Sequence, residues 1–241
     1  MGKIYKPTGK AGEVGSWAVN LYKGCFHGCK YPCHAAKRAA RFRWGPFNKP
    51  EPSKDVIANI EKAAHKYRGR SVFMCFSCDP YQPLDVKVGL TRQAIKILHD
   101  NEVAVRILTK GGERSERDFD LLSARPDLSF FGSTLTFLDN GLSIKWEPGA
   151  ALPESRLAAL EKAHRMGIPT WVSLEPVIDP EQTLALIKKT YKFVGLFGLG
   201  KWNYNAQAKT INWHAYVHEA IALCKKYGKE YYIKHDLEAY L

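Results

Sequence analysis

The 241 residues are enough for one sizeable hydrophobic core, and 45% hydrophobic content with 25% charged residues is ordinary for a soluble globular protein. Thirty-six Lys and Arg against 24 Asp and Glu give a formal net charge of +12, which favours a polyanionic partner such as nucleic acid. No run approaches the roughly 18 apolar residues of a membrane span, and residues 1–15 are polar and glycine-rich, so we expect a cytoplasmic protein that binds no membrane.

Residues 17–22 are short, apolar and partly β-branched, which predicts a first strand that delivers the following segment at its carboxyl end. That segment holds three of the six cysteines, Cys25, Cys29 and Cys33, at intervals of four. Pro32 and two glycines disfavour a regular helix, so we expect a loop. Thiolates brought this close repel one another and are soft donors, so a soft metal or an iron–sulfur cluster is the natural occupant.

Three occupants of the cysteine loop compete. A structural zinc site would need four ligands, which the three cysteines could supply together with His27 or His34, although no second pair of cysteines follows. Disulfides or plain packing are disfavoured in a chain that shows no secretory segment. The third option is a four-iron cluster held by three cysteines, which leaves one iron open and reactive.

The segment after the loop, residues 34–44, is rich in alanine and arginine. Its basic residues Lys37, Arg38, Arg41 and Arg43 are spaced to decorate one or two helical turns. They fit a solvated face and a phosphate-contacting face equally well. Three prolines and a glycine then end the segment.

Strands and helices alternate along the rest of the chain. Ser53 is expected to cap a helix that runs to residue 67, with Asp55 in its first turn. Further helices are expected at residues 90–101, 114–123, 153–166, 180–191 and 211–227. Strands are expected at residues 71–77, 103–109, 128–136, 168–174 and 193–198, with a short strand-like tail at 231–234.

This alternation, repeated at least six times, predicts a parallel sheet with right-handed crossovers. We expect an α/β fold, an open, partial (β/α)6 barrel of TIM type, because six units are too few for the closed eight. It would be a single domain over residues 1–241, with an N-terminal extension at 1–16 and a C-terminal helix and tail at 200–241. Ligands gather at the carboxyl ends of such strands. There the sequence places the cysteine loop, Cys78, Asp79, Lys110 and Glu175.

The cysteine loop resembles that of the radical S-adenosylmethionine (SAM) enzymes, in which three cysteines spaced three and then two residues apart hold a [4Fe-4S] cluster. Here Lys30, Tyr31 and Pro32 separate the last two cysteines, so Pro32 looks like an insertion. The resemblance implies that SAM chelates the fourth iron through its amino and carboxylate groups, and that Tyr31 lies near the adenine. The ligands it implies are Cys25, Cys29 and Cys33.

Further segments keep the order found in the spore photoproduct lyase-like (DNA repair photolyase-like) branch of that superfamily. They are residues 77–83, 90–92, 109–110, 117–122, 146–150, 156–157, 167–169 and 176–178. The resemblance implies that Asp79 and Lys110 bind the cofactor, with Lys110 neutralising the SAM carboxylate, and that Ser133 or Thr134 lies near the methionyl group. Without the resemblance, Lys110 is equally well a solvent-facing lysine at a strand end.

The activity implied by the resemblance is reductive cleavage of SAM, which yields methionine and a 5′-deoxyadenosyl radical that abstracts hydrogen from a substrate. An electron donor such as flavodoxin or ferredoxin is then required, and we expect a monomer. Cys78 is the candidate catalytic thiol, because a thiol can return a hydrogen atom to a substrate radical, whereas Cys75 fits an ordinary buried cysteine. Glu147 and Arg156 look like a family pair, although a structural salt bridge explains them equally well.

The substrate that these features favour is DNA or RNA, with the reacting base turned out of its stack. Trp202, Tyr204 and Trp213 offer stacking surfaces, or pack within the protein. A different kind of function is a zinc-stabilised, non-enzymatic nucleic-acid-binding module. It would keep the charge and the cysteines but leave Lys110 and Asp79 without a role.

Overall fold

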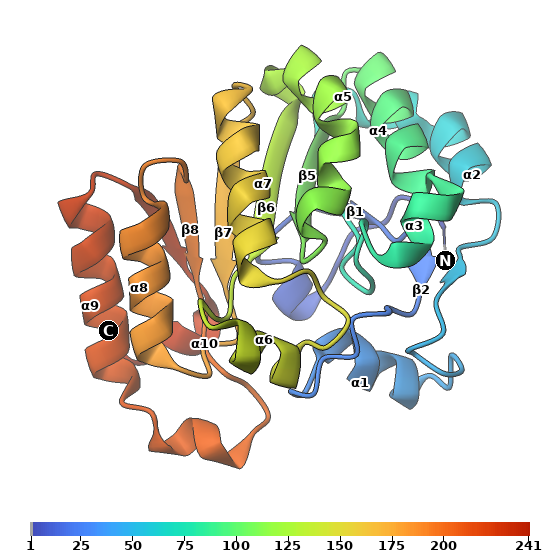
Figure 1. The fold of residues 1–241 in the computed structure, drawn as a ribbon. Helices are drawn as coiled ribbons and strands as arrows, with labels where there is room; N and C mark the ends of the chain where they lie inside the picture. Colours follow the sequence, from blue (N-terminus) through green and yellow to red (C-terminus); the bar gives the residue numbers. More distant parts are fainter. Residues whose placement is uncertain (1) are drawn as a thin grey trace.

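The computed structural model describes residues 2–241 and is built on a seven-stranded parallel sheet whose spatial order follows the chain (Figure 1). The strands, in that order, are β1 (Trp17–Val19), β4 (Ser71–Met74), β5 (Ala104–Thr109), β6 (Ser129–Thr134), β7 (Thr170–Leu174), β8 (Leu196–Leu199) and β9 (Glu230–Ile233). Since each strand is followed by its neighbour, right-handed crossovers place the connecting helices on one face and leave the other face concave. The predicted α/β class and open, partial barrel are confirmed.

The helices that connect the strands cover the convex face of the sheet (Figure 1). They are α2 (Val56–Ala63), α4 (Leu90–Asp100), α5 (Phe119–Ala124), α7 (Pro153–Arg165), α8 (Pro180–Thr190) and α9 (Trp213–Lys226). Shorter helices follow carboxyl ends of strands or the cysteine loop: α1 (His34–Arg41), α3 (Pro83–Val88), α6 (Asn140–Trp146) and α10 (His235–Glu238). The 3-10 helices are η1 (Gly9–Ala11), η2 (Ala64–Tyr67), η3 (Gly112–Asp118), η4 (Pro126–Leu128) and η5 (Ala206–Thr210). Within residues 2–241, no helix has the length and apolar character to span a bilayer.

The main core lies between the sheet and its covering helices. Ile95 of α4, Leu160 of α7 and Leu186 of α8 are fully buried there. Every residue of β7 is buried, as expected for a central parallel strand that is covered on both faces. The helix starts are encoded locally: α8 begins with Pro180, and the side chain of Asp179 accepts a hydrogen bond from the backbone amide of Gln182.

The concave face has an aromatic floor centred on Trp171. Its indole N–H donates to the carbonyl of Ile107 on β5 at 2.9 Å, so the ring reaches across β6. Gly132 of β6 makes this possible, because a Cβ there would lie 2.2 Å from the indole nitrogen. Phe73 of β4 packs edge-on against the same indole. Large side chains therefore fill the middle of the barrel and separate a cavity at the carboxyl ends of the strands from one at the amino ends of β1, β4 and β5.

Most predicted strands are shorter than expected, and in two of them the difference shapes the loops of the site. The strand predicted at 17–22 ends at Val19, and Tyr22 belongs instead to β2 (Tyr22–Lys23), which pairs antiparallel with β3 (Glu51–Pro52). The strand predicted at 71–77 ends at Met74, because Cys75 has a φ of 72°, which is incompatible with continued pairing. Both strands thus give way early to loops that reach over the concave face.

Other boundaries also differ from prediction. The helix predicted to be capped by Ser53 begins at Val56, with Asp55 in the N-cap position. The tail predicted at 231–234 is β9, a full seventh strand paired in parallel with β8. Helices α3, α6 and α10 were not predicted, because each is only four to seven residues long and too short for a periodic pattern.

Candidate active site

A cavity of about 280 Å³ lies at the carboxyl ends of the strands. One end of it is lined by Cys25, Cys29, Cys33, Cys78, Asp79 and Lys110. The other end is lined by charged residues from both termini of the chain, among them Lys10, Glu13, Lys234 and Asp236. The structure therefore brings the cysteine loop, the loop after β4 and the end of β5 around one space.

The cysteine loop is an irregular segment between β2 and α1, as predicted, and backbone hydrogen bonds hold it in place. The amide of Cys25 donates to the carbonyl of Phe47 at 2.7 Å, and the amide of Gly149 donates to the carbonyl of His27 at 2.9 Å. Gly149 is needed for this approach, since a Cβ there would lie 2.5 Å from the carbonyl oxygen of Phe26. Two segments outside the loop, at Phe47 and Gly149, thus fix the backbone that carries the thiols.

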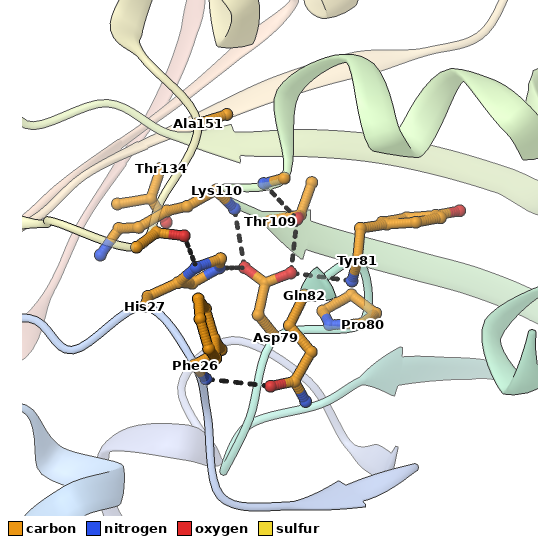
Figure 2. A network of polar contacts seen from close by, with 12 residues as sticks. Phe26, His27, Asp79, Pro80, Tyr81, Gln82, Thr109, Lys110, Thr134 and Ala151 are labelled. Atoms are coloured by element: carbon orange, nitrogen blue, oxygen red, sulfur yellow. Dashed lines mark hydrogen bonds and ion pairs between the residues drawn. The ribbon is translucent and has the colours of Figure 1, made fainter. Parts of the chain in front are cut away.

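Asp79 joins the cysteine loop to the end of β5 (Figure 2). One carboxylate oxygen accepts from the amide of Tyr81 at 2.8 Å and from the hydroxyl of Thr109 at 2.6 Å. The other accepts from the amide of Lys110 at 2.7 Å and lies 2.9 Å from Nε2 of His27. Burial by itself raises the pKa of the Asp79 carboxyl, but the His27 ion pair and these hydrogen bonds outweigh it and hold the pKa well below its usual range.

These contacts make Asp79 an organising residue, because both of its oxygens are engaged by protein groups. Gln82, on the same loop, is fully buried and strengthens the link. Its side-chain oxygen accepts from the amide of Phe26 at 3.0 Å (Figure 2), and its amide group donates to the carbonyl of Gly24 at 3.4 Å. The loop after β4 therefore sets the position of the first cysteine.

A second buried network surrounds Glu147. The hydroxyl of Tyr31 donates to its carboxylate at 2.6 Å, Lys110 Nζ lies 3.1 Å from it, and Arg156 Nη2 lies 2.6 Å away. Burial raises the pKa of the Glu147 carboxyl, but Lys110 and Arg156 lower it more. For Lys110 the effects have the opposite sign. Burial lowers the pKa of its ammonium group, but the neighbouring Cys29 and Glu147 raise it by more, so the net shift is upward. Both predicted pairs, Lys110 with the cysteine loop and Glu147 with Arg156, are in contact.

The charge of this network suits an anionic occupant next to Cys29. Two cations, Lys110 and Arg156, face one carboxylate, Glu147, which leaves one buried positive charge uncompensated. Lys110 Nζ lies 3.9 Å from the sulfur of Cys29. Burial raises the pKa of the Cys29 thiol, Lys110 opposes that shift, and a bound metal centre would favour the thiolate further.

The donor set fits an iron–sulfur cluster held by three cysteines, and of the two histidines considered as a fourth zinc ligand only His34 lines the cavity with a side chain that is not already engaged by Asp79. Within residues 2–241, no three His, Cys, Asp or Glu side chains are arranged to hold one metal ion. His27 uses Nδ1 against the carbonyl of Gly149 at 3.0 Å and Nε2 against Asp79, so it has no free nitrogen for a metal. The three thiols instead line a cavity, which suits a larger cluster bound at three corners.

The remaining predicted residues lie close by, in different roles. Ser133 is buried, and its hydroxyl donates to the carbonyl of Thr109 at 3.0 Å, whereas its neighbour Thr134 lines the cavity. Cys75 and Cys78 both line it as well. Of the predicted stacking residues, Trp202 and Trp213 are buried and Tyr204 is exposed.

Several motif segments named above have a structural role beneath the site. Arg117 lies 2.7 Å from Asp85, whose carboxylate also accepts from the amide of Thr91 at 3.0 Å and from the hydroxyl of Tyr22. Asp85 is itself buried. This cluster ties α3 and the start of α4 to the strand that precedes the cysteine loop.

Sequence reasoning missed the residues that close the far end of the cavity. Lys10 forms an ion pair with Asp236 at 2.6 Å, and Glu13 accepts from the amide of His235 at 3.3 Å. Lys234 pairs with Glu175, which was expected at this edge. The residues from the termini carry no motif, and their proximity follows only from the position of β9 beside the open side of the barrel.

Comparison with known proteins places this geometry in a family. The family model of the radical SAM superfamily matches residues 19–194. Uncharacterized proteins of Mycobacterium tuberculosis and Mycobacterium bovis are 24% identical over 209 residues, which cover 82% of this chain. The chain spans 61% of the length of these curated relatives.

Solved structures share the fold. Spore photoproduct lyase complexed with dinucleoside spore photoproduct superposes with a TM-score of 0.72 at 13% identity, covering 97% of this chain and 79% of that one. A variant of that lyase with bound AdoMet gives 0.71 at 14% identity, over 98% and 79% of the two chains. Streptococcus suis SuiB bound to the precursor peptide SuiA gives 0.65 at 14% identity, over 92% and 50%. The chain belongs to the radical SAM superfamily, whose domain implies a [4Fe-4S] cluster and SAM.

Proposed function

We propose that Cys25, Cys29 and Cys33 hold the cluster, and that the enzyme uses the resulting radical on nucleic acid in a spore photoproduct lyase-like reaction. The observation that carries the ligand assignment is the convergence of the three thiols on one cavity, with Lys110 beside Cys29 in a buried cluster of two cations and one carboxylate. When bound, the cluster and SAM supply the electron transfer and the radical. A reductant must supply the electron, for which flavodoxin or ferredoxin is the proposed class.

In this proposal the chain's own residues bind and orient SAM. Lys110 offers its ammonium to the SAM carboxylate, and the Glu147 network holds that ammonium in place. Tyr31 lies within the same network, next to the position proposed for the adenine. Thr134 is a better candidate than Ser133 for the methionyl end, because Thr134 lines the cavity. Asp79 acts by positioning His27 and the amide of Lys110.

Cys78 is the proposed hydrogen-atom donor to a substrate radical. It lines the same cavity as the three cluster cysteines, and Cys75 lies beside it. Burial keeps the Cys78 thiol protonated by raising its pKa, and a protonated thiol is the form that can donate a hydrogen atom.

We also propose that residues 1–241 act as one radical SAM core domain. Residues 200–241 supply β9, which pairs with β8. The extension at 1–16 supplies Lys10 and Glu13 to the cavity. Both terminal segments therefore belong to the unit that encloses the site.

The experiment is anaerobic purification, followed by measurement of iron, sulfide and zinc and by addition of dithionite and SAM. Near four irons per chain with release of 5′-deoxyadenosine supports the cluster assignment. Cys29→Ala should lose the iron and the cleavage, while the buried Cys224→Ala, on α9 and outside the cavity, should keep both. Full iron content in Cys29→Ala, or stoichiometric zinc in the wild type, would contradict the proposal.

A further inference from the structure

Residues 14–50 contain no Asp or Glu, although one residue in ten of the whole chain is acidic. Over the same stretch the chain carries seven cations: Lys23, Lys30, Lys37, Arg38, Arg41, Arg43 and Lys49. Within residues 2–241, Lys23 alone among these seven is engaged in an ion pair, with Glu51. The cysteine loop and α1 therefore form the surface with the least compensated positive charge next to the cavity.

This surface also exposes aromatic rings, which is unusual for a solvated charged helix. Phe42, just after α1, is 55% exposed and stacks on Trp44 with ring centroids 6.0 Å apart and planes 19° apart. The Arg38 guanidinium lies 5.8 Å from the Phe42 ring and 5.9 Å from the Trp44 ring, and the Arg41 guanidinium lies 5.8 Å from Phe42. Alternating rings and guanidinium planes are what a stacking platform for nucleobases requires.

The platform continues to the cavity. Arg38 also lines the cavity, and α1 begins directly after Cys33. Tyr204, on the loop after β8, is 56% exposed, and Lys37 Nζ sits 4.0 Å from the centre of its ring. α1 lies apart from the helices that cover the sheet (Figure 1), and its residues Lys37, Arg38 and Arg41 are exposed. Cations and rings therefore line the approach to the cysteine loop.

We propose that this surface, which we call the α1 platform (Lys37, Arg38, Arg41, Phe42, Trp44 and Tyr204), binds single-stranded nucleic acid and leads it to the cavity. Single strands are favoured over duplexes because only unpaired bases present their faces to Phe42 and Trp44. Chemistry on a base also requires the base out of its stack. The proposal rests on the proposed function and narrows its substrate class.

The test is fluorescence anisotropy with labelled oligonucleotides on the cluster-loaded protein, without SAM or reductant. The probes are an oligo(dT) and an oligo(U) of about 12 nucleotides and a duplex of the same length, a size that matches known single-strand sites. Salt is varied between about 50 and 200 mM, where phosphate contacts are most visible. We expect both single strands to bind more tightly than the duplex.

Variants separate stacking from charge. Phe42→Ala with Trp44→Ala should weaken single-strand binding about tenfold or more, since each stacked base is lost, while Trp44→Phe should retain most of it. Arg38→Gln with Arg41→Gln should reduce the slope of log K against log salt concentration by about 1.4, at about 0.7 per lost phosphate contact. The control variant, Lys188→Gln with Lys189→Gln, removes two exposed cations from α8 and should leave nucleic-acid binding unchanged.

The outcomes are distinct. Duplex binding as tight as single-strand binding, or full binding by the Phe42 and Trp44 variants, would overturn the proposal. An effect of the arginine variants alone would also overturn it and would fit phosphate contacts without base stacking. Because the assay needs no SAM cleavage, a protein that binds single strands but releases no 5′-deoxyadenosine would refute the proposed function and leave the α1 platform standing.

Discussion

Asp79→Asn tests whether the organisation of the site depends on one buried carboxylate. Asparagine keeps the oxygen that accepts from Tyr81 and Thr109 but turns an amide N–H₂ toward the amide of Lys110 and toward His27. Two charge-assisted contacts are lost, at about 1.5–3 kcal/mol each. The expected loss is therefore about 3–5 kcal/mol of unfolding free energy, in line with the cost of breaking a buried ion pair.

The assay is anaerobic urea unfolding of Asp79→Asn and wild type, with iron content measured on the same samples. Asp100→Asn is the matched control, because Asp100 makes an exposed ion pair with Lys96 at 2.8 Å that contributes about 0.3–0.5 kcal/mol. We also expect Asp79→Asn to retain less iron, since His27 lies in sequence between Cys25 and Cys29, two of the three proposed cluster ligands. If Asp79→Asn matched Asp100→Asn within about 0.5 kcal/mol, the reasoning about the buried carboxylate would be wrong.

Two further predictions concern the same buried charges. Glu147→Gln leaves Lys110 and Arg156 buried without their counter-ion. It should lower the free energy of unfolding in urea by about 3–5 kcal/mol and weaken SAM binding in equilibrium dialysis. The control, Glu61→Gln at an exposed position, should change neither quantity. The folded-state pKa of Asp79 lies below its unfolded value of about 3.9, so its stabilisation is complete above that pH and is lost as the pH falls below it. Unfolding midpoints measured from about pH 6 to 3 should fall most steeply below about pH 4, and less steeply for Asp79→Asn; identical slopes would contradict this.

The sequence predicted the fold where patterns are long and periodic. Helices such as α7 and α8 were placed to within one residue, because a proline at the first turn and a regular apolar face mark them. It failed where geometry depends on single backbone conformations: the left-handed φ of Cys75 ends β4, and nothing in the residue type announces it. β9 was predicted only as a tail, because its four residues gain their pairing from β8 rather than from any local pattern.

The site was predictable as a set of strand-end residues but not as a set of contacts. The order of predicted strands placed the three cysteines, Asp79 and Lys110 at the carboxyl ends of the strands. It could not show that both carboxylate oxygens of Asp79 accept hydrogen bonds from protein groups. The register of β6 is a similar case, since Ser133 and Thr134 are adjacent and only the pleat decides which one faces the cavity. Contacts of this kind depend on the tertiary arrangement of several loops.

The two ends of the cavity are stabilised by forces of very different strength, and this follows from the open barrel. β1 and β9 are the two edges of the seven-stranded sheet, so the concave face between them is covered by the N-terminal extension. The extension is anchored by Ile4 in the core and by backbone hydrogen bonds between Tyr5 and Ala18. Beyond that anchor, Lys10 and Glu13 make contacts that are partly exposed, and an exposed ion pair contributes only about 0–1 kcal/mol. At the cysteine end, by contrast, Asp79 and Glu147 are buried, and removing either leaves cations or donors without partners. The cysteine end is therefore the more strongly held part of the site. We expect the resistance of the molecule to denaturation to depend more on this end than on the contacts that Lys10 and Glu13 make with the C-terminal segment.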